Sequence, residues 1–263
     1  MKLRIGSVPY LNAKPLVDWF HSEDCDIDAE ITYAVPSQLA RMLKEDALDV
    51  ANVSIFECFQ NSELLAVPDI SISATGAVKS VRLFSRCPLE EVKTVALDTS
   101  SLTSAALTRI LLSECFHITP QYTHYQPDLD AMLKHFDAGL IIGDLKIFEL
   151  SPDVSVYDLG AGWLNLTGLP FVYACWLGRK DRLTTAHVDA LNESKKWGST
   201  RLYEIASHWA KQLSVPFDRA LDYLVNVMDY SLPPEHIEAA KLFQNKCHNH
   251  DLIAEIHPIH LYG

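Results

Sequence analysis

The sequence predicts an α/β protein with two lobes, and three observations support this prediction. Short apolar runs alternate with segments of helical periodicity over the first 180 residues, the pattern of β-α-β units with parallel strands. The chain has 263 residues, which suits two compact lobes at roughly 100–200 residues per domain. Its 48% hydrophobic and 21% charged residues are typical of a globular protein and exclude a disordered or fibrous one.

The first series of elements extends from the N-terminus to residue 67. Apolar runs predict strands at residues 5–8, 29–35, 48–53 and 64–67. Helices are predicted between them, at residues 15–20, around 39–43 and at 56–60. Pro15 is tolerated at the start of a helix because its missing N–H is not needed there. Leu39, Met42 and Leu43 have the i, i+3, i+4 spacing of an amphipathic helix.

A second series follows residues 80–84, and a helical region follows that. The second series has predicted strands at residues 94–97, 121–125 and 139–143 and helices at 100–116 and 129–136. In the final third, apolar stripes predict helices at residues 202–213, 217–228 and 233–243. Neither Gly nor Ser clusters between the two series, so we expect lobes joined by strands. We also expect the helical tail to pack on the first lobe.

Charge and segment patterns exclude several classes of protein. The formal charge is −12, from 22 Lys+Arg against 34 Asp+Glu, which argues against partners such as nucleic acid or an anionic membrane. No run approaches the roughly 18 apolar residues of a membrane span, and the N-terminus lacks a secretory pattern. We therefore expect a cytoplasmic protein. Its six cysteines are far apart without a Cys-x-x-Cys pair, which favours buried thiols over disulfides or zinc.

The usual catalytic signatures do not occur. The sequence has no G-x-G-x-x-G, no P-loop motif and no G-x-S-x-G, the marks of nucleotide cradles and esterase elbows. Cys247, His248 and His250 are spaced like metal ligands, but their place near a polar C-terminus favours solvated side chains. No general base stands out among the other histidines.

Polar residues stand at the ends of several predicted strands, where open parallel sheets bind their ligands. Asn12 follows the first strand, Ser54 follows the third, and Ser80 precedes the second series. Each has another interpretation, Asn12 as an Asx turn or cap and the serines as ordinary caps. Gly143 and Asp144 end a strand of the second series. The Asp144 carboxylate is expected either to bind a substrate hydroxyl or to cap the next helix.

The segment at residues 98–104 is a candidate anion site. Ser101, Thr103 and Ser104 belong to a cluster of hydroxyls where a predicted strand turns into a helix. The first N–H groups of a helix lack partners, and its dipole adds about half a positive charge there. These features suit a carboxylate or a phosphate. Redundant capping, which a single Ser would accomplish, is the alternative.

Seven short motifs follow one another in order between residues 4 and 176. They are Arg4-Ile5-Gly6-x-Val8-x-Tyr10-Leu11-Asn12-x-x-Pro15-Leu16, Asp49-Val50-Ala51, Ser80-Val81, Leu97-Asp98-x-x-Ser101-x-Thr103-Ser104, Ile142-Gly143-Asp144, Asp158-Leu159-Gly160-x-x-Trp163 and Thr167-Gly168-Leu169-Pro170-Phe171-Val172-x-Ala174-x-Trp176. Together they resemble the chorismate dehydratase family of the futalosine route to menaquinone. Two positions depart from that family, in which Leu102 is often Arg and Asn52 is usually aliphatic.

The resemblance implies a two-lobed fold like that of type II periplasmic binding proteins, with the ligand in a cleft between the lobes. The first lobe would comprise residues 1–82 and 178–263, and the second residues 83–177. Two crossover strands, near residues 81–84 and 173–177, would form the hinge. This architecture agrees with the two α/β series in the sequence.

The resemblance also implies the reaction, in which chorismate loses water to give 3-[(1-carboxyvinyl)oxy]benzoate in menaquinone (vitamin K2) biosynthesis. The protein would be a lyase with a small-molecule substrate and no cofactor or metal. Asn12 and Ser80 would be catalytic and would orient a substrate carboxylate that acts as the base. The substrate-binding residues would be Ser54, Ser101, Thr103, Ser104, Gly143 and Asp144. Two alternatives stay open, a 1,4-dihydroxy-6-naphthoate synthase-like lyase of the same pathway and a non-catalytic solute-binding protein.

Overall fold

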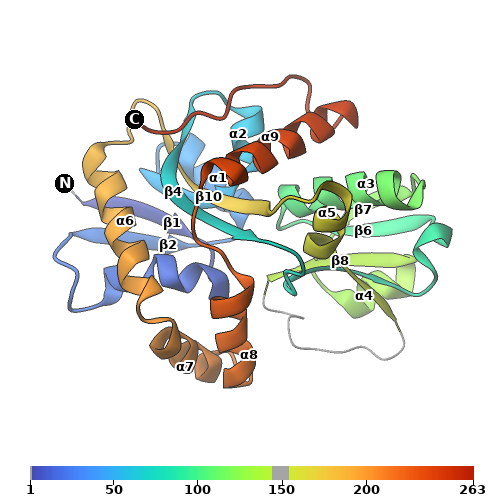
Figure 1. The fold of residues 1–263 in the computed structure, drawn as a ribbon, viewed down its shortest axis with the longest axis horizontal. Coiled ribbons are helices and arrows are strands. Elements are labelled where there is room, and N and C mark those ends of the chain that lie inside the picture. Colours follow the sequence, from blue (N-terminus) through green and yellow to red (C-terminus); the bar gives the residue numbers. More distant parts are fainter. Residues whose placement is uncertain (1, 144–153) are drawn as a thin grey trace.

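The structure, a computed structural model, describes residues 2–143 and 154–263 and contains two five-stranded sheets (Figure 1). The first sheet has the order β2-β1-β3-β10-β4 and is built from β1 (Leu3–Ser7), β2 (Ala29–Tyr33), β3 (Val50–Ser54), β4 (Leu64–Ala74) and β10 (Phe171–Arg179). The second has the order β7-β6-β8-β5-β9 and is built from β5 (Val81–Ser85), β6 (Thr94–Asp98), β7 (Gln121–Tyr125), β8 (Ala138–Ile142) and β9 (Ser155–Asp158). The mixed α/β class is as predicted.

One strand in each sheet runs against the others. β1 is parallel to β2 and β3, and β6 is parallel to β7 and β8, as the alternating pattern predicts. β10 is antiparallel to β3 and β4, and β5 is antiparallel to β8 and β9; no direction was predicted for these two crossover strands. β5 and β10 are the strands by which the chain enters one sheet after leaving the other. They start at the edge where the parallel strands end, and therefore run in the opposite direction.

The helices differ from the predicted set around Pro15, at residues 217–228, and in two helices that were not predicted, Leu159–Thr167 and Thr185–Ser199. The segment predicted as one helix at residues 15–20 forms two 3₁₀ helices, η1 (Leu11–Leu16) and η2 (Asp18–His21), and Pro15 lies inside η1. The segment predicted as one helix at residues 217–228 forms a short α-helix, Phe217–Asp222, followed by a π-helical turn, Tyr223–Val227. The other helices and turns are α1 (Pro36–Lys44), α2 (Phe56–Gln60), η3 (Leu89–Glu91), α3 (Leu102–Phe116), α4 (Leu129–His135), α5 (Leu159–Thr167), α6 (Thr185–Ser199), α7 (Leu202–Gln212), α8 (Phe217–Asp222), η5 (Tyr223–Val227) and α9 (Pro234–Asn249).

The chain passes between the sheets twice, at residues 75–80 and at residues 168–170. The Asp158 carboxylate holds the first of these segments against the start of α5, because it accepts hydrogen bonds from the amides of Val78 at 3.0 Å and Lys79 at 2.7 Å. β10 lies wholly in the first sheet, so sheet membership changes before the predicted hinge at residues 173–177. The predicted lobe boundaries themselves stay a prediction.

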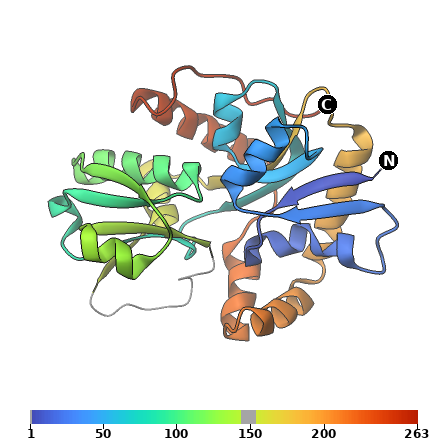
Figure 2. The same cartoon turned by 180° about the vertical axis from the view of Figure 1, so that it is seen from behind.

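The helical tail covers the first sheet and also reaches the second half of the molecule. α6 contacts η1, η2 and β4, while α9 contacts both β10 and α3 (Figures 1 and 2). Glu114 of α3 binds two residues of the tail, Lys246 Nζ at 2.5 Å and His250 Nε2 at 3.0 Å. The tail packs on the first sheet as predicted, and its last helix also contacts α3 of the second half.

A continuous hydrophobic core extends across the two halves. Trp163 of α5, Phe171 of β10 and Phe243 of α9 form its aromatic centre, with ring centroids 4.9–5.8 Å apart and the rings edge to face. Edge-to-face pairs of this kind stabilise beyond their buried area. Within the part of the chain that the structure describes, no helix is long and apolar enough to cross a membrane.

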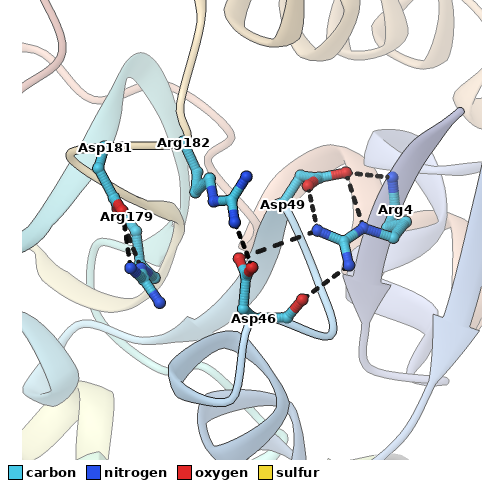
Figure 3. A network of polar contacts seen from close by, with 6 residues as sticks. All are labelled: Arg4, Asp46, Asp49, Arg179, Asp181 and Arg182. Atoms are coloured by element: carbon cyan, nitrogen blue, oxygen red, sulfur yellow. Dashed lines mark hydrogen bonds and ion pairs between the residues drawn. The ribbon is translucent and has the colours of Figure 1, made fainter. Parts of the chain in front are cut away.

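A network of charged side chains joins β1, the loop before β3 and the segment after β10 (Figure 3). The Arg4 guanidinium on β1 donates to Asp49 Oδ1 at 2.5 Å and to the Asp46 carbonyl at 2.7 Å. Arg182, just after β10, binds the Asp46 carboxylate. Burial raises the pKa of Asp49, but the hydrogen bonds from Arg4 outweigh this effect and hold it below its usual value. These contacts join the loop before β3 to the neighbouring strands.

Candidate active site

A cavity lies at the carboxyl ends of the parallel strands, between the two sheets. It contains about 590 Å³ of space free of protein atoms, a volume that includes open solvent. Its wall takes residues from the first sheet and η1, from the start of α3, from the end of β8 and from residues 78–81. Parallel strands place their ligands at this edge of a sheet. The cavity is therefore the candidate active site.

Six of the eight predicted site residues line this one cavity. They are Asn12, Ser54, Ser80, Ser101, Ser104 and Gly143. Thr103 is 1% exposed and does not contribute to the wall. Asp144 lies outside the described residues. Side chains up to 131 positions apart in the chain thus meet as the strand-end argument predicts.

Asn12 and Ser80 are joined by a tyrosine that sequence reasoning missed. Tyr223 of η5 is 1% exposed; its hydroxyl donates to Ser80 Oγ at 2.8 Å and accepts from Asn12 Nδ2 at 3.3 Å. The apolar stripe predicted for residues 217–228 follows regular helical spacing and does not include Tyr223. In the structure, residues 223–227 form a π-helical turn, whose spacing differs from that of an α-helix. The position of Tyr223 beside the site therefore has no local signal in the sequence.

The start of α3 presents hydroxyls to the cavity. Ser101 is the N-cap of this helix, and its Oγ accepts from the Ser104 amide at 3.1 Å and donates to Ser104 Oγ at 3.0 Å. Asp98 holds the preceding turn by accepting from the Ser100 amide at 2.7 Å, and burial raises the pKa of its carboxyl. Ser101 thus has the capping role that was its alternative, while it also lines the cavity with Ser104.

Thr103 contacts the first sheet and not the cavity. Its Oγ1 is hydrogen-bonded to Ser54 Oγ and also lies 3.4 Å from the Tyr173 carbonyl oxygen. Ser54 Oγ accepts in addition from the Phe56 amide at 3.1 Å. Thr103 therefore connects α3 to β3 and β10 across the gap between the sheets. Any effect of Thr103 on a ligand passes through Ser54.

Gly143 is needed at its position for two reasons. Its φ is +76°, in the left-handed region that favours glycine, and a Cβ would lie 3.0 Å from the Tyr10 ring. The Gly143 amide donates to the Ser80 carbonyl at 2.9 Å. The end of β8 thus lies directly against residues that follow β1 and precede β5.

The described part of the wall carries no full charge. Among the described residues that line the cavity there is no Asp, Glu, His, Lys or Arg, and the titratable ones are Tyr10 and Tyr173. Burial raises the pKa of Tyr173 well above its ordinary value, and the charge of Asp158 adds to this effect. Tyr173 is therefore neutral at physiological pH. The described wall can bind and polarise a ligand through dipoles but contributes no strong base.

Four polar atoms of the wall have no hydrogen-bond partner among the described residues. They are Asn12 Oδ1, Tyr173 Oη and both side-chain atoms of Asn52. Buried polar atoms are nearly always paired, so unpaired atoms of wall residues are candidates for contact with a bound molecule. Asn52 and Tyr173 were not among the predicted site residues.

The candidate metal cluster near the C-terminus does not form. Cys247 is fully buried and His250 is paired with Glu114. The expectation that these side chains are solvated is therefore wrong for Cys247 and His250. In residues 2–143 and 154–263, no three His, Cys, Asp or Glu side chains gather as metal ligands. The pairing of His250 serves the contact between α3 and α9.

Two sheets around a cavity, connected by two passages of the chain, define a periplasmic-binding-protein-like fold. A protein from Archaeoglobus fulgidus has this fold with a TM-score of 0.78 at 17% identity, over 96% of this chain and 98% of that one. The periplasmic aliphatic sulphonate binding protein of Escherichia coli matches with a TM-score of 0.65 at 15% identity, over 100% of this chain and 94% of that one.

The chain belongs to a family described as menaquinone biosynthesis, whose model matches residues 3–249. A chorismate dehydratase from Thermus thermophilus is 33% identical over 230 residues, covering 80% of this chain and 83% of the relative. A chorismate dehydratase from Campylobacter jejuni is 26% identical over 253 residues, covering 92% of this chain and 96% of the relative. The resemblance in the motifs is thus confirmed at the level of the family.

Proposed function

We propose that this protein is a chorismate dehydratase, a lyase that converts chorismate into 3-[(1-carboxyvinyl)oxy]benzoate and water. The observation that carries the proposal is a cavity of amides and hydroxyls, without an ionised side chain in its described wall, in a chain of the menaquinone biosynthesis family. The proposal includes a cytoplasmic location. The six free cysteine thiols favour this location, because disulfides are rare there.

The chemistry of this dehydration suits such a wall. The ring hydrogen that is lost is in vinylogous conjugation with the ring carboxylate, so negative charge developing on carbon spreads onto that group. Loss of the neighbouring hydroxyl completes an aromatic ring, which drives the reaction. A carboxylate of the substrate takes the proton, and the departing hydroxyl receives a proton, so that water is the only other product. The protein has to orient these groups and exclude bulk water.

The described residues divide this task between the two sides of the cavity. Ser101 and Ser104, at the start of α3, hold an anionic group with hydroxyls and with the positive end of the helix. Asn12 and Ser80, joined through Tyr223, orient the reacting carboxylate and hydroxyl. Ser54 and Gly143 complete the wall. Asp144 is included in the proposal as a substrate-binding residue.

Incubation with chorismate tests the proposed function directly. The expected result is loss of chorismate and formation of an equal amount of 3-[(1-carboxyvinyl)oxy]benzoate. Chromatography and mass spectrometry measure both compounds. Binding without turnover would identify a solute-binding protein instead, which the fold neighbours also include. Absence of both binding and turnover would contradict the proposal and leave the naphthoate-forming lyase as the candidate.

Asn12→Asp tests the assigned catalytic role. The change is nearly isosteric but removes both donors and adds a charge that repels a dianion. Turnover should fall roughly 100- to 1000-fold, the range for loss of a preorganised donor, while a cooperative thermal transition shows that the variant still folds. Normal turnover would assign Asn12 to a structural role.

A second variant, Asp144→Asn, tests the binding role proposed for Asp144. This variant should bind chorismate more weakly. Complete loss of turnover with unchanged binding would instead identify Asp144 as the base.

A further inference from the structure

Asn52 lies in the middle of β3 with its side chain on the face of the sheet that lines the cavity. Its cross-strand partner is Trp176, and that of Ser54 is Ala174. Asn52, Ser54 and Ala174 all contribute to the wall, because residues two apart on a strand share a face. Asn52 therefore lies one step further along this face than Ser54.

The amide of Asn52 is buried and unpaired. The residue is 1% exposed, and neither Oδ1 nor Nδ2 has a hydrogen-bond partner in the part of the chain that the structure describes. A buried amide without partners destabilises a fold. Neighbouring wall residues, such as Ile72 and Val8, are apolar, so a leucine at this position would be better accommodated by the empty protein. A bound ligand would satisfy these unpaired atoms.

We propose that Asn52, at a position that is usually aliphatic in the family, gives this protein an additional contact with the ring hydroxyl of the substrate. An amide both donates and accepts, through Nδ2–H and Oδ1, and a hydroxyl is complementary to both. A carboxylate would pair only with Nδ2 and leave Oδ1 unpaired. Chorismate carries one hydroxyl, the group that the proposed reaction removes. This inference rests on the proposed function and gives Asn52 a contact that exists with substrate and is lost with product.

The opposite wall supports the same orientation. Ser101 and Ser104 come from the second half of the molecule and suit an anionic group, whereas Asn52 comes from the central part of the first sheet. A molecule with a carboxylate toward α3 can thus direct its hydroxyl toward β3. Product release is favoured as a consequence, because the aromatic product has no group that satisfies both atoms of Asn52.

The test compares substrate and product affinities in Asn52→Leu, a change of similar size that removes both polar atoms. Measured by rapid mixing before turnover, the Kd for chorismate should rise roughly 10- to 100-fold, the effect of losing one or two hydrogen bonds to a buried group. The Kd for 3-[(1-carboxyvinyl)oxy]benzoate should stay within about twofold, since that ligand makes no such contact. The melting temperature of the ligand-free variant should be unchanged or higher.

Gln244→Met is the matched control. Gln244 of α9 is also a buried amide, at 2% exposure, but its Nε2 donates to the His257 carbonyl at 2.8 Å and it lies outside the cavity wall. This variant should melt at a lower temperature and bind both ligands normally. Asn52→Leu should thus change the affinity for chorismate without lowering the melting temperature, and Gln244→Met should lower the melting temperature without changing the affinity. This difference distinguishes an amide that binds a ligand from an amide that stabilises the fold.

The outcomes distinguish this inference from the proposed function. Wild-type protein that neither binds nor converts chorismate would contradict both. Wild-type protein that is active, together with an Asn52→Leu variant that weakens both ligands equally or neither, would overturn the inference alone. A lower melting temperature with unchanged affinities would also overturn it, and would pair Asn52 with Trp176, whose Nε1 is likewise unpartnered among the described residues.

Discussion

Tyr223 is the side chain on which the two assigned catalytic residues depend. Its hydroxyl lies between Asn12 Nδ2 and Ser80 Oγ at hydrogen-bond distance from both, and it reaches them from a helical turn in the C-terminal third of the chain. A buried tyrosine hydroxyl in such a network limits the orientation of both partners. We regard it as a positioning residue, because it acts on substrate through them.

Tyr223→Phe keeps the ring but removes this link. We expect kcat for chorismate to fall roughly 10- to 100-fold, because a buried Ser80 hydroxyl that loses its partner costs about 1–3 kcal/mol. KM should change much less. Tyr230→Phe is the control, since Tyr230 is 7% exposed, lies outside the cavity wall and has a hydroxyl without a partner among residues 2–143 and 154–263. Equal kinetics in the two variants would remove Tyr223 from the site.

At the scale of elements, β3 carries both Asn52 and Ser54, so its register against β1 and β10 determines where these side chains stand. A shift of one residue would turn both away from the cavity. The Arg4–Asp49 pair adjoins the start of β3, and Arg182 extends the network to the end of β10 (Figure 3). The charged network thus stabilises the register on which the site depends.

Asp49→Asn should make the stability less dependent on pH. The pKa of Asp49 is lower in the folded protein than its usual value, so the folded state binds its proton less well than the unfolded chain. The pair therefore stabilises the protein above about pH 4, and this contribution is lost as the pH falls further. We expect a deficit of about 1 kcal/mol at pH 7, discounted for partial exposure, that disappears near pH 3.

Denaturant unfolding at several pH values measures this deficit. Asp181→Asn is the control, because Asp181 forms an exposed pair with Arg179 in the same network, 2.7 Å apart. This variant should leave stability nearly unchanged at all pH values. A deficit that persists at pH 3 in Asp49→Asn would show that lost packing, and not charge, explains the effect.

At the scale of the whole molecule, the two halves already touch around the cavity. Thr103 of α3 is bonded to Ser54 of β3, and the backbone at Gly143 lies against the Tyr10 ring. These contacts enclose the site on two sides. We expect a substrate of chorismate's size to enter as such contacts separate, by the hinge motion typical of two-lobed binding folds.

Small-angle scattering tests this motion. The ligand-free protein should have a radius of gyration larger than that calculated from the structure, and chorismate should reduce it to the calculated value. The physical reason is that the ligand contacts both halves and so favours the arrangement in which they are close. An unchanged radius, equal to the calculated one in both states, would mean that the site is permanently closed.

The sequence by itself determined the α/β class and predicted six of the residues that line the cavity. Alternating apolar runs and helical stripes reflect local burial, which each segment encodes separately. Asn12, Ser54 and Gly143 were predictable because polar residues at strand ends meet at one edge of a parallel sheet. The same argument predicted Ser101 and Ser104, since the strand before α3 ends at that edge.

Only the tertiary structure decided the features that depend on distant contacts. The reversed direction of β5 and β10 follows from the passages between the sheets, which no local pattern records. Tyr223 joins Asn12 across 211 positions of the chain, and a π-helical turn rather than a regular stripe directs it there. Thr103 carries the hydroxyl of its motif, yet packing turns it toward Ser54 and away from the cavity. Residue type is a local property, whereas the direction and partner of a side chain are set by what the rest of the fold brings next to it.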